Sequence, residues 1–209
     1  MKLQNLLKLY KDESISVLEE LDMSSVEKFV ELILHSYHNC QNIFMIGNGG
    51  NAAFVDNFVT DLNFHPFCSD NKDVPLNITK RIRAFNLCLS PSTLTGILND
   101  FGSNEIFTQQ LKVYSTQGDV LIGFSGSGNS KNILSAFNYA KENNIKTVLF
   151  TRNKDGLCHA VSDIIIYIPG TSSFPGQTGG NNNNFHYEDM ISKISHITTG
   201  ILKLEVTKN

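Results

Sequence analysis

Five short apolar segments alternate with helical patterns along most of this chain, and that alternation constrains the fold more than any other feature. The segments are "NIFMIG" (42–47), "RAFNLCLS" (83–90), "GDVLIGFS" (118–125), "KTVLFT" (146–151) and "DIIIYIPG" (163–170). Each is continuously apolar or β-branched, as in strands buried on both faces. Strands that alternate with helices need right-handed crossovers, so the sequence predicts an α/β fold with a doubly wound, five-stranded parallel sheet flanked by helices.

Helical spacing of apolar residues completes this outline of a single domain over residues 1–209. Residues 13–38 read as one or two amphipathic helices, broken at 22–25 with Ser24 or Ser25 as N-cap of the second. We expect an N-terminal helical segment (1–40), used for oligomerisation, before an α/β core (41–209). Further helices are predicted at 52–62, 104–114, 132–142, near 157–160 and, as the C-terminal helix, at 187–206. The Gly/Asn-rich stretch 176–185 is either a mobile loop beside a site or a plain linker.

Net charge and cysteine usage limit the kinds of binding partner and the cellular compartment that the sequence predicts. The net charge is -3, and basic residues are scattered apart from "KRIR" at 80–83, so no footprint for nucleic acid is present. The start turns charged too soon for a signal peptide, and no segment approaches the roughly 20 apolar residues that cross a bilayer. The four cysteines, at 40, 68, 88 and 158, form no C-x-x-C pair, so buried reduced thiols are expected. These features predict a cytoplasmic protein without a membrane or nucleic-acid partner.

Two of the predicted strands end in glycine-rich turns, "GNGG" (47–50) and "SGSGNS" (125–130). In the flavodoxin-like strand order 2-1-3-4-5, these two strands are neighbours and both turns border the crevice where such sheets bind ligands. The serine turn offers three hydroxyls and open backbone N–H groups just before a helix N-terminus, which favours a phosphate. The plainer alternative is a Ser/Gly turn with Ser130 as N-cap.

The kind of phosphate compound is narrowed by what the two turns lack. No Gly-Lys-Ser/Thr follows, which excludes a P-loop, and "GNGGNA" lacks the G-x-G-x-x-G spacing of a dinucleotide site. A monophosphate on a small molecule is favoured. Asp100 is expected with Asn99 at the crevice rim, or else as a cap of the segment from residue 103. The predicted substrate-binding residues are Asn48, Gly49, Gly50, Asn51, Asn99, Asp100, Ser125, Ser127 and Ser130.

These motifs carry a family resemblance. "IGNGGNAAFVDNFVTDL", "LTGILNDFGSNEIF", "GDVLIGFSGSGNSKNIL" and the final helix resemble the SIS (sugar isomerase) domain over residues 16–206, and "NDFG" (99–102) resembles its phosphoheptose isomerase group. The resemblance implies an intramolecular oxidoreductase that converts a ketose phosphate such as sedoheptulose 7-phosphate for lipopolysaccharide or capsule synthesis. It also implies a homotetramer with shared active sites and N-terminal helices in the subunit contacts.

Several positions depart from the family pattern. Asn51 stands where the family usually has Ser, and Asn57 and Asp61 stand where it has a metal-binding His and a catalytic Glu. On the final helix, Glu188 stands where the family has Gln, and His196 matches the family's downstream His. Zinc is the implied metal, with Asp61, Glu188 and His196 as its candidate ligands. Asn is a poor zinc ligand, so the departures count against that site.

Aldose–ketose isomerisation needs a base that moves a proton between adjacent carbons and an acid at the carbonyl oxygen. The resemblance implies Asp61 as base and His196 as acid, brought together from the helices of two subunits, with Glu188 as a substitute base or as a partner that orients His196. Viewed singly, these residues also fit solvated carboxylates and an interface histidine. His65 is a displaced ligand or the end of a helix before Pro66. The alternative function is a non-catalytic SIS module that binds a sugar phosphate or a protein partner, which Asn51 and Asn57 favour.

Overall fold

A computed structural model describes residues 2–71, 73–170, 172–176 and 184–208 of the chain. Its strands form one parallel sheet in the order β2-β1-β3-β4-β5, which confirms the predicted order. Most of the predicted Gly/Asn-rich loop at 176–185 lies outside the described residues. The strands are β1 (Asn42–Gly47), β2 (Arg83–Asn86), β3 (Val120–Phe124), β4 (Lys146–Thr151) and β5 (Ile164–Tyr167).

The helices differ from the sequence-based prediction mainly at their starts. The α-helices are α1 (Leu3–Glu19), α2 (Met23–His38), α3 (Gly50–Phe64), α4 (Pro91–Phe101), α5 (Thr108–Tyr114), α6 (Lys131–Glu142) and α7 (Phe185–Val206), with 3-10 turns at His65–Phe67, Ser103–Glu105 and Leu157–Val161. The N-cap of α2 is Asp22, whose carboxylate accepts from the Ser24 N–H, so the prediction of Ser24 or Ser25 was wrong. Helix α4 was not predicted, although it begins with a Ser90 cap and a proline in its first turn.

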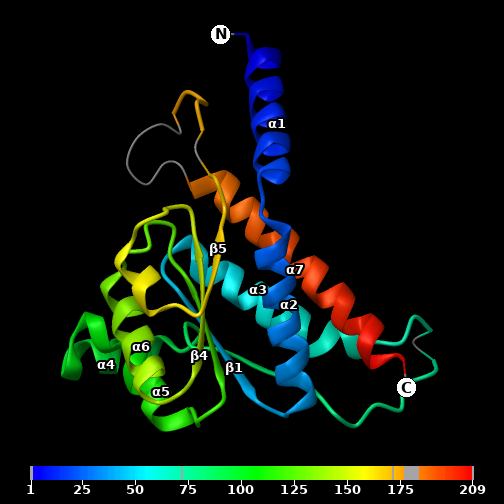
Figure 1. Cartoon of the computed structure of the whole chain (residues 1–209), viewed down its shortest axis with the longest axis vertical. Helices are drawn as coiled ribbons and strands as arrows, with labels where there is room; N and C mark the ends of the chain where they lie inside the picture. The colour runs from blue at the N-terminus through cyan, green and yellow to red at the C-terminus, as the bar shows by residue number, and fades with distance from the viewer. Residues whose placement is uncertain (1, 72, 171, 177–183, 209) are drawn as a thin grey trace.

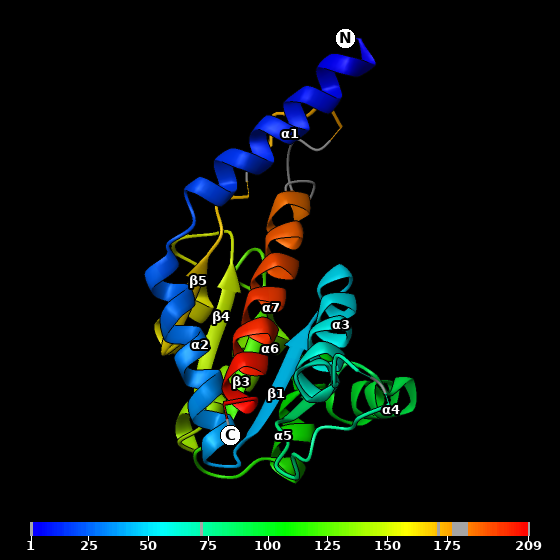
Figure 2. The same cartoon turned by 90° about the vertical axis from the view of Figure 1, so that its right-hand side faces the viewer.

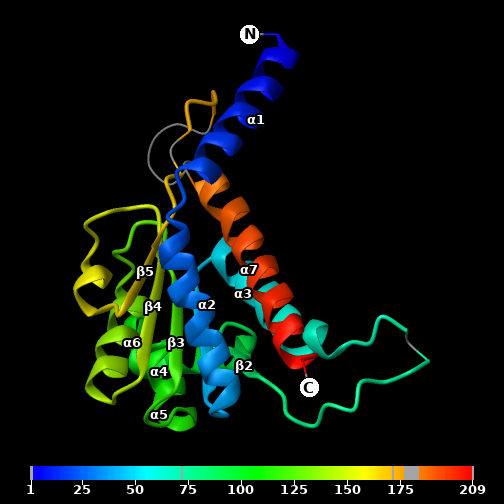
Figure 3. The ribbon, with the colours of Figure 1, turned by 45° about the vertical axis from the view of Figure 1, so that its right-hand side comes forward.

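Continuously apolar strands place core residues on both faces of the sheet. Figure 2 shows helices α2 and α7 in front of the sheet. In β1, Ile43 and Met45 pack on one side with α2, α3 and α7, and Phe44 and Ile46 pack on the other with α5 and α6. The contact between α3 and α7 is the most extensive one between helices. It places the first turn of α7 near the first turn of α3, at the edge of the sheet where the strands end (Figure 3).

Helix α1 extends beyond the sheet (Figure 1). Its side chains Leu3 and Leu7 are 69% and 63% exposed, so an apolar surface is left uncovered along this helix. Across the described ranges, no helix is both long and apolar enough to cross a membrane. The cysteines are free, but Cys40 and Cys68 are exposed, so the expectation of buried thiols was wrong for these two.

Candidate functional site

The two glycine-rich turns lie side by side. Strands β1 and β3 are paired with Gly47 opposite Phe124, so the turns that follow them leave the same edge of the sheet. Together they line a pocket of about 300 Å³, which confirms their predicted adjacency. Helices α3 and α6 begin directly after these turns, and each helix N-terminus carries a partial positive charge of about half an electron. This end of the sheet therefore attracts an anion.

The serine hydroxyls of the second turn belong to this pocket and not to helix capping. Ser130 is at the N-cap position of α6, but its side chain makes no capping hydrogen bond. Its Oγ lies 3.0 Å from Ser125 Oγ instead. Ser127 also lines the pocket, and its Oγ accepts from the Asn129 N–H at 3.2 Å. The three hydroxyls can rotate to donate to an anion, as the phosphate interpretation requires.

Two asparagines of the first turn have distinct surroundings. The Asn48 side chain is joined to that of Asn132 by two amide hydrogen bonds of 3.0 and 2.8 Å, which link the start of α6 to the first turn. Asn51 is buried, and among the described residues its Oδ1 has no hydrogen-bond partner. An unsatisfied buried acceptor costs free energy unless a ligand or water donates to it. Asn51 also lines the pocket, so its Oδ1 is a candidate acceptor there.

Glu188 enters the same pocket from the first turn of α7. A methyl group built on Gly50 would lie 2.9 Å from Glu188 Oε1, so any larger residue at position 50 would displace the carboxylate. Burial, and then the negative charge of Asp189, raise the pKa of the Glu188 carboxyl above its ordinary value. A carboxylate with a raised pKa is a stronger base, which suits proton abstraction.

Asp61 and His196 meet within one chain, in a different pocket. His196 Nε2 lies 3.6 Å from Asp61 Oδ2, and these residues line a pocket of about 280 Å³ with His65, Thr199 and Gly200. We expected that helices of two subunits would bring Asp61 and His196 together. That expectation was wrong, because α3 packs on α7 of the same chain. At 1.5 Å per residue, Asp61 lies about 16 Å along α3 from Gly50, and His196 about 12 Å along α7 from Glu188. Among the described residues, the two pockets share no lining residue.

The implied zinc does not fit these residues. Asn57 Nδ2 donates to Asp61 Oδ2 at 3.1 Å, so the residue in place of the family's histidine presents an N–H to the carboxylate. Its remaining amide oxygen is a poor zinc ligand. The third candidate ligand, Glu188, lines the other pocket. In the part of the chain that the structure describes, no group of three or more His, Cys, Asp or Glu side chains is arranged to hold a metal ion.

Asn99 and Asp100 do not belong to the crevice rim. Both lie on helix α4, where Asn99 Nδ2 donates to Asp100 Oδ1 at 2.8 Å, and neither lines the pocket at the two turns. Asp100 lies inside α4 and does not cap the segment from residue 103. The prediction failed because this stretch was taken for a loop, whereas its apolar residues belong to an exposed amphipathic helix.

The structure adds two residues that sequence reasoning missed. Asn184 lines the pocket just before α7, and it accepts a hydrogen bond from Arg152 at 2.8 Å. Arg152 follows directly after β4, and the carboxyl end of a strand next to the serine turn is itself a signal for a ligand contact.

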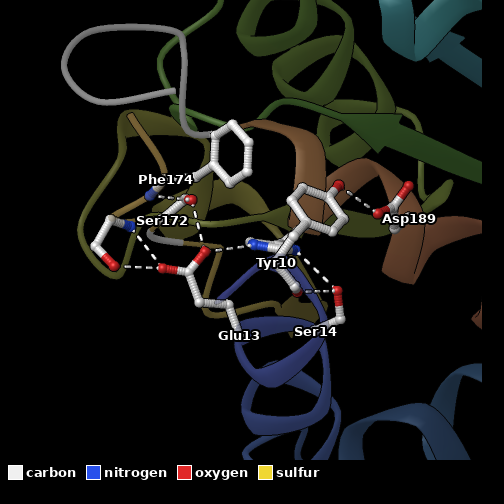
Figure 4. Close-up of polar contacts among 8 residues, drawn as sticks. Tyr10, Glu13, Ser14, Ser172, Phe174 and Asp189 are labelled. Atoms are coloured by element: carbon white, nitrogen blue, oxygen red, sulfur yellow. Dashed lines mark hydrogen bonds and ion pairs between the residues drawn. The ribbon is translucent and has the colours of Figure 1, made fainter. Parts of the chain in front are cut away.

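A network of hydrogen bonds holds the start of α7 against α1 (Figure 4). His186 is buried; its Nε2 lies 3.0 Å from Glu13 Oε2, and its Nδ1 lies 3.3 Å from Ser14 Oγ. Tyr10 donates to Asp189 at 2.8 Å. These contacts involve residues on both sides of Glu188, so α1 supports the turn that carries the candidate base. The network, called the Glu13 network below, comprises Tyr10, Glu13, Ser14, Ser172, Ser173, His186 and Asp189.

The Glu13 network is expected to make the free energy of unfolding depend on pH. Partial burial raises the pKa of Glu13, but hydrogen bonds from Ser173, Ser172 and His186 outweigh it and lower the pKa to about 2. Because the folded pKa is below the unfolded one, the stabilisation is complete above the ordinary pKa of 4.5 and is lost as the pH falls through about 2.

Glu13→Gln is therefore expected to lower the free energy of unfolding by about 1–3 kcal/mol at neutral pH. Urea unfolding of both proteins at a series of pH values measures it, and the difference should shrink in acid. Glu19→Gln, on the exposed side of the same helix, is the matched control. Equal losses for the two variants would contradict the assigned role of Glu13.

A doubly wound sheet with two adjoining turns that expose hydroxyls, amides and helix N-termini defines an α/β protein with a pocket suited to an anion at the carboxyl ends of its strands. A family model of the SIS domain matches residues 10–151. The chain is 32% identical over 158 residues to a phosphoheptose isomerase of Helicobacter pylori strain Shi470, with 76% of each chain covered. It is 31% identical over 161 residues to one of Burkholderia pseudomallei strain 1710b, with 77% of each covered.

Solved structures agree on the fold. A phosphoheptose isomerase of Neisseria gonorrhoeae superposes with a TM-score of 0.77 at 24% identity, over 96% of this chain and 98% of that one. One from Francisella tularensis gives a TM-score of 0.75 at 19% identity, over 97% and 98%. The chain belongs to the SIS domain family and, within it, to the phosphoheptose isomerases.

Proposed function

We propose that this chain is a phosphosugar isomerase that interconverts the ketose and aldose forms of a sugar phosphate such as sedoheptulose 7-phosphate. One observation carries the proposal: the serine turn, the glycine turn, two helix N-termini and a carboxylate of raised pKa line a single pocket. Relatives that are named phosphoheptose isomerases support the same reaction. They do not favour the alternative of a non-catalytic SIS module.

In this proposal, the serines and asparagines of the pocket bind the substrate, and Glu188 transfers a proton. The hydroxyls of Ser125, Ser127 and Ser130 donate to the phosphate, and Asn48 and Asn51 bind sugar hydroxyls. Glu188 removes a proton from the carbon beside the carbonyl, and the electron pair of the broken C–H bond forms the enediol double bond. Glu188 then returns the proton to the former carbonyl carbon, and the other enediol hydroxyl gives its proton to the imidazole of His196, which has just protonated the carbonyl oxygen. The carbonyl thus moves by one carbon without net oxidation.

The Asp61–His196 pair supplies the acid in this proposal. Enediol formation requires a proton at the carbonyl oxygen. The His196 side chain is 64% exposed, so it is accessible to a neighbouring subunit. Asp61 faces the imidazole and orients it. Because the pair and the pocket with the serine turn are separate within one chain, we propose that a neighbouring subunit presents its pair to that pocket.

A homotetramer with shared sites fits the uncovered apolar side chains of α1, which are expected in the subunit contacts. The expected setting is the cytoplasm, in the synthesis of heptose for lipopolysaccharide or capsule. The substrate is a small sugar phosphate, with no nucleic acid or membrane involved.

A direct assay tests the proposed function. Purified protein is expected to isomerise sedoheptulose 7-phosphate, and Ser127→Ala is expected to raise KM by about tenfold, because a hydrogen bond to a charged group is lost. The assay is run with and without added zinc, and with Ser162→Ala as a serine control outside the pocket. If the wild-type protein turns over no ketose phosphate that it binds, the isomerase proposal fails.

A further inference from the structure

Arg152 joins the serine turn to the start of α7. It is half-buried and follows directly after β4, the strand next to β3. Its backbone N–H donates to the Gly126 carbonyl oxygen at 3.1 Å, and its Nε donates to Asn184 Oδ1 at 2.8 Å. One residue therefore contacts both the serine turn and the segment that leads to Glu188.

Gly126 shows how closely this pair approaches the turn. A methyl group built on Gly126 would lie 2.7 Å from Asn184 Oδ1 and 3.4 Å from Arg152 Nε. The amide and the guanidinium therefore pack directly on the backbone of the serine turn, and Asn184 itself lines the pocket. Because Asn184 Oδ1 accepts from Arg152, the amide is oriented, and its Nδ2 is the end that remains to donate.

A phosphate in this pocket needs a nearby positive charge, which the Arg152 guanidinium can supply. Of the described residues that line it, Glu188 alone is ionisable, and a carboxylate repels a phosphate dianion. The helix N-termini offset part of this repulsion. A guanidinium packed against the lining residues Gly126 and Asn184 offsets more, because it is always charged and its planar donors match phosphate.

We propose that Arg152 and Asn184 are specificity-determining residues for the phosphate group of the substrate. Arg152 supplies positive charge beside the serine turn and holds the Asn184 amide so that Nδ2 donates to the anion. This inference rests on the proposed function, since it assigns the phosphate to that pocket.

Calorimetric titration with inorganic phosphate at low salt, and with sedoheptulose 7-phosphate, tests it. Arg152→Gln is expected to raise the Kd for phosphate by about tenfold and Asn184→Ala by about threefold. The double variant should bind little worse than Arg152→Gln, because the two residues act as a unit. Lys154→Gln is the matched control: it removes a positive charge from the same loop, where Lys154 Nζ lies 5.0 Å from the centre of the Tyr167 ring, and should leave the Kd within about twofold.

The outcomes separate this inference from the proposed function. If Ser127→Ala weakens phosphate binding while Arg152→Gln matches the Lys154→Gln control, the role of Arg152 is overturned and the proposed function stands. If the wild-type protein binds neither phosphate nor the sugar phosphate, both fail. Thermal melts establish that each variant is folded. If Arg152→Gln does not fold, Arg152→Lys decides, since it loses the planar donors: a raised Kd supports the role and an unchanged Kd overturns it.

Discussion

Glu188→Gln is expected to lower kcat for the isomerisation of sedoheptulose 7-phosphate by about 10³-fold, because the amide cannot accept the proton that the reaction moves. Substrate binding should stay as tight as in the wild type or become tighter. The substitution removes the one ionisable group among the described lining residues, and with it the repulsion of the phosphate dianion. Initial rates and calorimetric titration of the same preparations measure both quantities.

The opposite changes in rate and affinity make this prediction specific. A merely structural role for Glu188 would weaken binding together with turnover, because Glu188 packs against the first turn of α3 at Gly50. Glu142→Gln, an exposed residue at the end of α6, is the control for loss of a carboxylate. Glu188→Gln with more than a tenth of wild-type kcat would assign the base elsewhere.

His196→Ala is expected to lower kcat by about 10²-fold through loss of the acid, and Asp61→Asn by about tenfold through loss of the group that orients the imidazole. If the Asp61–His196 pair serves the pocket of a neighbouring subunit, two inactive variants should complement each other. Mixing unfolded Glu188→Gln and His196→Ala chains and refolding them should restore roughly a quarter of wild-type activity, since random pairing gives one intact site in each mixed pair of subunits.

Complementation distinguishes the two ways in which the pair might act. Refolding each variant alone is the control and should give no gain. If the mixture is as inactive as the separate variants, although size exclusion shows mixed oligomers, the pair does not act across a subunit contact. His159→Ala is the matched histidine control, because His159 contacts the Asn153 and Gly156 carbonyl oxygens outside either pocket.

The strands and the pocket with the two turns could be predicted from sequence because their signals are local. Continuous apolar runs mark strands buried on both faces, and a glycine or serine turn after such a run marks the edge of the sheet where ligands bind. Asn48, Asn51 and the serines of 125–130 lie where this pattern places them. Asn99 and Asp100 do not, because a short exposed helix has a weaker signal than a strand, and a family motif located them without showing their surroundings.

The sequence by itself determined the parallel sheet, its strand order and a pocket between two turns, since each depends on residues that are neighbours in the chain or at the ends of paired strands. Only the tertiary structure decided that Asp61 and His196 meet in a pocket of their own, that Glu188 joins the turns and that Arg152 packs beside them. Those contacts depend on how α7 lies against α3 and β4. That packing is set by the core as a whole, and no local pattern encodes it.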